Sequence, residues 1–189
     1  GVIAPLQWQD RPTDLRPPIE IEGEHDYLTE IHTQAEAFVN TLADRLKASV
    51  SQGGKGGAVF LIDYGFPESE YFHPQRHMGT LMCHQLHKSD PDPLVDVGQK
   101  DITAHVNFTG IALAAQDAGL HVLGYTSQAH FLINCGLLPP LVDAPMDEKS
   151  MAQKLITEHE MGELFKVVAF GTTEWEPMGF AQGDRTYAL

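Results

Sequence analysis

Apolar residues recur every three or four positions across segment 27–48, and this spacing predicts a long amphipathic helix. Asp26 is a suitable N-cap for this helix, and the glycine-rich run 51–57 would end it. An unbroken apolar run follows at 58–62, which predicts a strand buried on both faces. The predicted apolar stripe of the helix consists of Leu28, Ile31, Ala35, Phe38, Leu42 and Leu46.

The second half of the chain alternates between helix and strand in the same way. Asn107 is a suitable N-cap for a helix that ends at Gly119. Prolines instead predict an irregular N-terminal segment at 1–25 and a long loop insertion at 66–100. Strands that alternate with helices indicate an α/β fold with a layered sheet. The other predicted elements are a strand, two helices and a last strand, at 120–128, 129–137, 150–161 and 164–171.

The composition of the 189 residues, with 42% hydrophobic and 20% charged, is that of a globular domain. The net charge of −14 would repel the phosphates of nucleic acids and membranes, so we expect neither as a partner. A basic protein segment would be attracted, unless the acidity serves only solubility. Cys83 and Cys135 form no disulfide framework, so we expect two free, buried thiols in a reducing compartment.

Asp63 and Tyr64 directly follow the predicted strand at 58–62, and Gly65 lets the chain turn sharply after them. Open α/β sheets place their ligands beyond the carboxyl ends of the strands. An acid at that place can orient a cation or accept a proton, and a tyrosine can donate or accept a hydrogen bond. The pair is therefore either one wall of an active site or only the polar cap of a strand, and the residues alone leave both interpretations open.

A group of histidines with the spacing of helical metal-ligand pairs is a second candidate. The prolines of the same segment favour loops, and a His-Glu-x-x-His motif is absent, so we expect no metal. The residues concerned are His73, His77, His84 and His87, with Asp90, Asp92 and Asp96 alongside them.

Asp101 and His105 form a third candidate, because a carboxylate can hold an imidazole tautomer and tune its pKa in an acid–base pair. Equally, the two residues can satisfy backbone groups where a loop enters a helix. The chain contains no phosphate loop, no Gly-x-Ser-x-Gly elbow and no Gly-x-Gly-x-x-Gly loop after a strand.

Six motifs occur in one order between about 26 and 170, and together they resemble the C-terminal half of the MidA-like family of S-adenosylmethionine-dependent methyltransferases. Mitochondrial relatives in that family are protein-arginine methyltransferases needed for the assembly of respiratory complex I. The motifs are YLTEI, GGAVFLIDYG, GTLMCHQLH, DPLVDVGQKDITAHVNF, GYTSQAHFLINCGL and EMGELFKVVAF.

The resemblance implies part of a class I, Rossmann-like methyltransferase sheet with a reversed last strand. Segment 58–65 would be its fifth strand, 120–128 its sixth and 164–171 its antiparallel seventh, within a C-terminal half that spans 26–189. Family members carry a Gly-rich cofactor loop and an Asn-Glu-Phe-Asp-like motif in an N-terminal half, and neither occurs here. We therefore expect S-adenosylmethionine as the cofactor of the intact enzyme, and no cofactor bound to this chain alone.

The implied reaction is methyl transfer to an arginine nitrogen of a protein substrate with a basic segment, and we expect a bacterial cytoplasmic or a mitochondrial matrix protein. The alternative is a non-catalytic interaction module that docks a basic partner. Acids are needed to orient a guanidinium, because this group is almost always charged. The catalytic candidates are Asp63, Tyr64, Asp101 and His105, and the substrate-binding candidates are Glu30, Gly79, Thr80 and Gln128.

Overall fold

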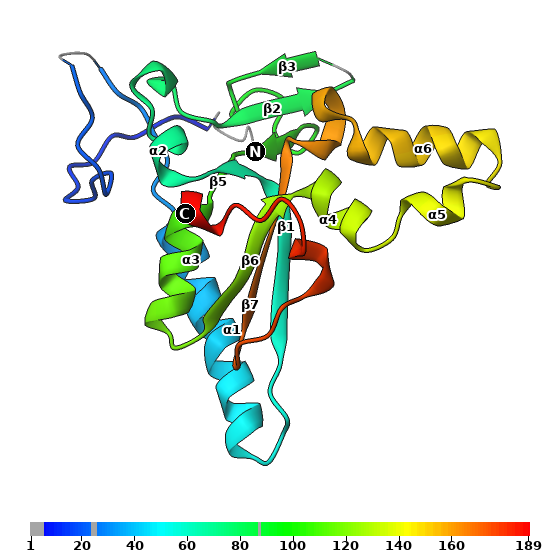
Figure 1. Ribbon diagram of the computed structural model, residues 1–189. Helices are drawn as coiled ribbons and strands as arrows, with labels where there is room; N and C mark the ends of the chain where they lie inside the picture. Colours follow the sequence, from blue (N-terminus) through cyan, green and yellow to red (C-terminus); the bar gives the residue numbers. More distant parts are fainter. Residues whose placement is uncertain (1–5, 24–25, 87) are drawn as a thin grey trace. The chain divides into compact units, whose positions relative to one another are not determined.

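The structure is a computed structural model that describes residues 6–23, 26–86 and 88–189 (Figure 1). The chain forms two compact units. The first comprises Gly1–Ile31 and Phe72–His105, and the second comprises His32–Tyr71 and Val106–Leu189. Each unit is described below by itself.

A four-stranded mixed sheet forms the centre of the second unit (Figure 1). Its strands, in spatial order, are β5 (Val106–Asn107), β1 (Ala58–Phe66), β7 (Phe165–Gly171) and β6 (His121–Ser127). β1 runs parallel to β5, whereas β7 runs antiparallel to both β1 and β6. The last strand of the chain is therefore reversed between two strands that share a direction, as the resemblance to the methyltransferase family implies.

β7 is buried on both faces and separates two apolar clusters. Val168 and Phe170 belong to the larger cluster, which is formed with the helices α1 (Thr33–Ser51) and α3 (Phe108–Asp117). Val167 and Ala169 point to the other face, where they form the smaller cluster with Phe180. This alternation is the two-residue period of a strand, and it explains why the run of apolar residues in this strand is unbroken.

The α3 helix forms as predicted, because its ends carry the expected capping residues. The side chain of Asn107 accepts a hydrogen bond from the backbone N–H of Gly110, at 3.3 Å. At the other end, Gly119 has a φ of +82°, a left-handed conformation that glycine adopts without steric cost. Phe108, Ile111 and Ala115 form the buried face.

The remaining helices of the second unit are short, and most lie beyond the carboxyl ends of β1 and β6. They are α2 (Glu68–Tyr71), α4 (Gln128–Asn134), α5 (Leu138–Leu141), α6 (Met146–Ile156), the π-helical turn Glu158–Gly162, and the 3-10 turns Met178–Phe180 and Thr186–Ala188. The predicted helix at 150–161 thus begins four residues earlier and ends at Ile156, and the short helix α5 precedes it.

The first unit contains a three-stranded antiparallel sheet, where the sequence predicts mainly loop. The central strand β2 (Met82–Gln85) pairs with β3 (Lys88–Asp90) and β4 (Asp101–Thr103), and the turn Pro74–Arg76 precedes it. The prediction of a loop insertion at 66–100 is therefore wrong in this part. Strands of three or four residues are too short to show an alternating pattern, so the prolines around them dominate the sequence signal.

α1 begins at Thr33 rather than at Tyr27, and its N-cap is His32 rather than Asp26. The preceding residues are held by a distant segment of the first unit: the N–H of Leu28 donates to the carbonyl of His77, at 2.9 Å. The side chain of Glu30 is bound by the same segment, as described below. These contacts bind the N–H of Leu28 and the carboxylate of Glu30 outside a helix, which corrects the predicted start.

Two predictions of burial are also corrected. β1 is not buried on both faces, because Phe60 and Ile62 are 41% and 51% exposed. Cys83 is buried in β2 as expected, whereas Cys135 is exposed just after α4. Within the described part of the chain, no helix has the length and apolarity needed to cross a membrane.

Candidate active site

Three of the predicted site residues, Glu30, Thr80 and His105, are joined by hydrogen bonds in the first unit, and Glu30 lies at the centre. The carboxylate of Glu30 accepts hydrogen bonds from the backbone N–H of Thr80 at 2.9 and 3.0 Å, and from the N–H of Leu81 at 2.9 Å. The hydroxyl of Thr80 donates to the same carboxylate at 3.0 Å. That hydroxyl also accepts a hydrogen bond from the backbone N–H of His105, at 3.0 Å.

Gly79 lies beside this group, at a position where any other residue would be strained. Its φ is +72°, and a Cβ atom added there would lie 2.7 Å from Oε1 of Glu30. Gly79 and Thr80 therefore lie in a segment that the half-buried carboxylate of Glu30 holds in place. Charge-assisted hydrogen bonds of this kind are about twice as strong as neutral ones. Glu30 thus acts by positioning the loop and, through Thr80, the backbone of His105.

We expect that Glu30→Gln lowers the free energy of unfolding by about 2 kcal/mol, since hydrogen bonds to a charged group contribute roughly 1.5–3 kcal/mol. The amide of glutamine also turns an N–H₂ group towards the donors of Thr80 or Leu81. Urea denaturation of the variant and of the parent protein measures the change. Glu22→Gln, at an exposed position of the same unit, is the control, and an equal loss in both variants would contradict the anchoring role of Glu30.

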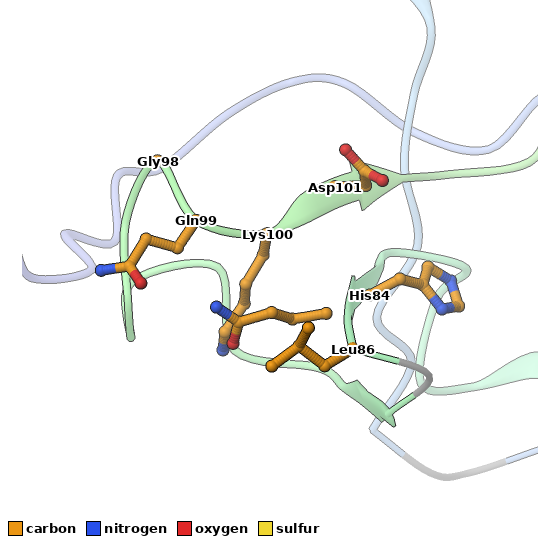
Figure 2. A pocket seen from close by; sticks show the side chains of 7 residues that line it. His84, Leu86, Gly98, Gln99, Lys100 and Asp101 are labelled. Atoms are coloured by element: carbon orange, nitrogen blue, oxygen red, sulfur yellow. The ribbon is translucent and has the colours of Figure 1, made fainter.

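Asp101 lies in β4, directly opposite His84 of β2. Both residues line an open cleft together with Leu86, Gln99 and Lys100 (Figure 2). The carboxyl group of Asp101 points away from the side chain of Lys100 (Figure 2). Asp101 is exposed, so its carboxylate can meet a ligand at this edge of the small sheet.

Lys100 in the same cleft is already paired. Its ammonium group donates to both carboxylate oxygens of Asp90, at 2.8 and 2.9 Å, and to the carbonyl of Asp92, at 3.3 Å. The hydrogen bond to Asp90 raises the pKa of Lys100, and the same bond lowers the pKa of Asp90. This ion pair holds together the two ends of the loop that joins β3 to β4. Its role is therefore structural.

Asp63 and Tyr64 lie near the carboxyl end of β1 in the second unit. The ring of Tyr64 packs edge-on against Phe165, with 5.2 Å between the ring centroids. Oδ1 of Asp63 accepts a hydrogen bond from the backbone N–H of Tyr64, at 2.8 Å, and the carboxylate is exposed. Asp63 and Tyr64 thus lie within β1 rather than after it, and Gly65 continues the strand in a pair with Val106, which corrects the predicted sharp turn. The carboxylate of Asp63 is an accessible negative charge.

The residue opposite Asp63 in the sheet is Lys166, but the charge of Lys166 is directed elsewhere. Its ammonium group bonds the backbone carbonyl and the carboxylate of Glu163, and Arg185 binds that carboxylate with two N–H groups. Burial raises the pKa of Glu163, but the hydrogen bond from Arg185 and the charge of Lys166 outweigh it, so the pKa lies below its ordinary value. Because Lys166 is engaged with Glu163, it does not neutralise Asp63, and no ion pair of Asp63 is found among the residues that the structure describes.

Gln128, the last candidate, is buried at the start of α4. Its side-chain amide donates to the carbonyl of Leu155 in α6, at 2.9 Å. The amide thus joins α4 to α6 by a contact within the fold.

A pair that the sequence analysis missed lies in the second unit at the start of α1. The hydroxyl of Tyr71 is 2.8 Å from Nε2 of His32, and the two rings meet edge to face. Tyr71 is almost fully buried. An imidazole hydrogen-bonded to a phenol can pass a proton. The two residues are 39 positions apart, and no local pattern connects them.

Tyr125 in β6 is a second buried tyrosine that the sequence analysis did not single out. Its hydroxyl has no hydrogen-bond partner within the described residues. Burial raises the pKa of Tyr125 above its ordinary value, and the charge of Glu70 adds to this effect. Tyr125 is therefore neutral at physiological pH and cannot accept a proton there.

Among the residues that the structure describes, no three or more side chains of His, Cys, Asp or Glu lie close enough together to hold a metal ion, and this includes the predicted histidine cluster. His87 lies outside those residues. His73 instead accepts a hydrogen bond at Nδ1 from the N–H of Gln75, at 3.2 Å, and so caps the turn Pro74–Arg76.

Comparison with known proteins places these residues in a family. The model of the family described as "Putative S-adenosyl-L-methionine-dependent methyltransferase" matches residues 4–126. A comparison with curated proteins finds no match.

Two crystal structures from Burkholderia thailandensis are similar to this chain. One, a "likely methyl transferase" bound to S-adenosyl-homocysteine, is 45% identical over 89% of this chain, with a TM-score of 0.79. The other, an uncharacterised protein of the same superfamily, is 46% identical over 86% of this chain, with a TM-score of 0.78. This chain spans 44% of the length of each of them. Because the family model covers well over half of the sequence, the chain belongs to this family of S-adenosyl-L-methionine-dependent methyltransferases.

Proposed function

We propose that this chain is the C-terminal half of a MidA-like methyltransferase, and that the whole protein methylates arginine residues of a protein substrate. The membership of the family and the S-adenosyl-homocysteine bound to a similar protein support the methyl donor. This chain spans 44% of the length of each similar protein, which is consistent with one half of a methyltransferase of this family. The arginine acceptor rests on the resemblance to the MidA-like family and on the accessible acid described next.

The observation that carries the proposal is the position of Asp63. β7 runs antiparallel between β1 and β6, so β1 and β6 end at the same edge of the sheet. Ligands of open α/β sheets bind beyond the carboxyl ends of the strands, and Asp63 and Tyr64 lie near that end of β1. The uncompensated carboxylate of Asp63 is therefore where a bound cation would be expected.

A guanidinium group suits this carboxylate for chemical reasons. The group is planar and stays charged, so its nitrogen lone pairs are delocalised and its orientation decides whether one nitrogen can react. A carboxylate can hold two of its N–H groups at once and thereby fix that orientation. In this proposal Asp63 orients the acceptor, Tyr64 forms a wall beside it, and positioning supplies much of the rate.

The methyl donor needs residues outside those described here. Gly65 is the glycine at the end of β1, but it does not form a cradle for a cofactor. A Cβ atom added to it would lie 2.1 Å from the carbonyl oxygen of Val106, so the backbone of β5 already occupies that space. We therefore propose that other parts of the whole protein hold S-adenosylmethionine, and that this chain alone does not bind it.

The test is a methyl-transfer assay with the full-length protein, S-adenosylmethionine labelled in its methyl group, and a basic peptide with one arginine. We expect label on the arginine, and none on a matched peptide in which lysine replaces it. Label on a different residue type would overturn the arginine acceptor. Failure of the full-length protein to bind S-adenosyl-homocysteine in calorimetry would overturn the methyltransferase proposal itself.

A further inference from the structure

Tyr125 of β6 is a buried residue whose polar atom contributes nothing to the fold. The side chain is 1% exposed, and its hydroxyl has no hydrogen-bond partner within the described residues. A buried hydroxyl without a partner destabilises a folded protein, because it has lost its hydrogen bonds with water. Phenylalanine would fill nearly the same space without this cost. Packing alone therefore does not explain why the side chain carries a hydroxyl.

The position of Tyr125 is fixed by contacts of its ring and of its backbone. The ring meets Phe108, the first residue of α3, with 5.3 Å between the ring centroids, and both residues belong to the larger apolar cluster. The backbone N–H of Tyr125 donates to Oδ1 of Asp184 at 3.0 Å, and its carbonyl accepts a hydrogen bond from the N–H of Arg185 at 2.6 Å. The hydroxyl is therefore held in a defined place.

The side chains of Tyr125 and Asp63 lie on the same face of the sheet. Lys166 of β7 is opposite Asp63 of β1 and also opposite Ser127 of β6. Tyr125 precedes Ser127 by two positions, and alternate residues of a strand share a face. Only β7 lies between β1 and β6, so these two strands are about 10 Å apart. A small ligand between their carboxyl ends can therefore contact groups from both strands.

The phenol of Tyr125 also lies close to an acid at the carboxyl end of β1. Burial raises the pKa of Tyr125 above its ordinary value, and the charge of Glu70 raises it further. Glu70 belongs to α2, which follows the end of β1. The phenol is therefore near the edge of the sheet at which Asp63 lies, and it stays neutral there.

We propose that Tyr125 is a positioning residue of the methyl-acceptor site. Its hydroxyl donates a hydrogen bond to one ordered water molecule, and this water accepts a hydrogen bond from the guanidinium group that Asp63 holds. That the bound guanidinium is methylated rests on the proposed function, whereas its binding at this edge of the sheet is tested separately below.

The chemistry of the guanidinium group favours such a water. The group carries five N–H donors, and one carboxylate can take two of them. The others need hydrogen-bond acceptors once the group leaves bulk water. A water held by a neutral phenol provides one without adding a second negative charge. Buried waters typically bind polar groups that the fold leaves without a partner, and their bridging hydrogen bonds are nearly as favourable in enthalpy as direct ones.

The test compares Tyr125→Phe with the parent sequence in the full-length protein, saturated with S-adenosyl-homocysteine. Calorimetry measures the Kd of a basic peptide with one arginine. We expect the substitution to raise this Kd about tenfold, the effect of one hydrogen bond to a charged group. The Kd of S-adenosyl-homocysteine should not change, because the water contacts the methyl acceptor and not the donor. The melting temperature should stay the same or rise, because the substitution removes a buried hydroxyl without a partner.

Tyr71→Phe is the matched comparison for stability. Tyr71 is as buried as Tyr125, but its hydroxyl is 2.8 Å from Nε2 of His32, so its loss should lower the melting temperature. A similar loss in Tyr125→Phe would show that the hydroxyl of Tyr125 has a partner within the whole protein, and would overturn the proposal. An unchanged Kd of the peptide would overturn it as well.

Methyl transfer to the same peptide separates this proposal from the proposed function. Tyr125→Phe should raise KM for the peptide about as much as it raises the Kd, and should change kcat less. If the parent protein methylates no arginine but Tyr125→Phe still weakens peptide binding, the proposed function fails and the role of Tyr125 stands. If both proteins methylate the arginine with equal KM, the role of Tyr125 fails and the proposed function stands.

Discussion

Replacing Asp63 by asparagine in the full-length protein is expected to lower kcat/KM for arginine methylation at least about a hundredfold, with no change in melting temperature. A hundredfold loss corresponds to about 2.7 kcal/mol of transition-state stabilisation. This size is reasonable for a carboxylate that orients a cation, because asparagine keeps the shape of the side chain but loses the charge and one acceptor.

The stability should not change, because the fold uses little of Asp63. In the part of the chain that the structure describes, the hydrogen bond of Oδ1 with the N–H of Tyr64 is the contact found for this carboxylate. The amide oxygen of asparagine can accept the same bond. The side chain is also exposed, so the substitution leaves no buried group without a partner.

The measurement combines single-turnover methyl transfer with thermal unfolding of the same preparations. Asp117→Asn, at an exposed position at the end of α3, is the matched control and should keep full activity. If Asp63→Asn also retains full turnover, Asp63 only caps the strand and the orienting carboxylate must be sought elsewhere.

The elements of the second unit were predictable because their signals are local. β7 contains the unbroken apolar run 167–170, β6 contains Val122, Leu123 and Tyr125, and α3 carries an N-cap, an apolar face and a terminal glycine within thirteen residues. The start of α1 was not predictable in this way. Leu28 and Ile31 continue the apolar spacing of the helix, but the contacts of Leu28 and Glu30 with 77–81 decide the conformation, and those partners are about 50 residues away.

In the candidate site, too, some residues could be recognised from the local sequence, whereas others are brought together only by contacts between distant parts of the chain. The sequence pattern alone pointed to Asp63 and Tyr64, since they follow the predicted strand at 58–62, although both lie within β1 in the structure. Glu30, Gly79 and Thr80 came from the resemblance of motifs to a known family, whereas His105 was singled out with Asp101 from the residues themselves. The structure joins Glu30, Thr80 and the backbone of His105 by hydrogen bonds. His32 and Tyr71 belong to no motif, and only the folded chain brings them together.

Gly65→Ala is expected to lower the free energy of unfolding by about 3 kcal/mol or more, the upper range for overpacking. The added methyl group would lie 2.1 Å from the carbonyl oxygen and 2.7 Å from the nitrogen of Val106. Both are backbone atoms of the paired strand β5, so no side chain can rotate away to relieve the clash. The parallel pairing of Gly65 with Val106, and of Phe66 with Asn107, would have to open. Urea denaturation measures the loss.

The consequence extends beyond stability, because Asn107 is also the N-cap of α3 and its backbone is placed by the pairing with Phe66. Opening the pair therefore disturbs both the end of β1, where Asp63 lies, and the first turn of α3. Gly110→Ala is the matched control: its methyl group would lie 3.2 Å from the amide nitrogen of Asn107, a side chain that can yield, and alanine favours the helix by about 1 kcal/mol. Equal stability of Gly65→Ala and Gly110→Ala would show that β1 and β5 do not pair in this register.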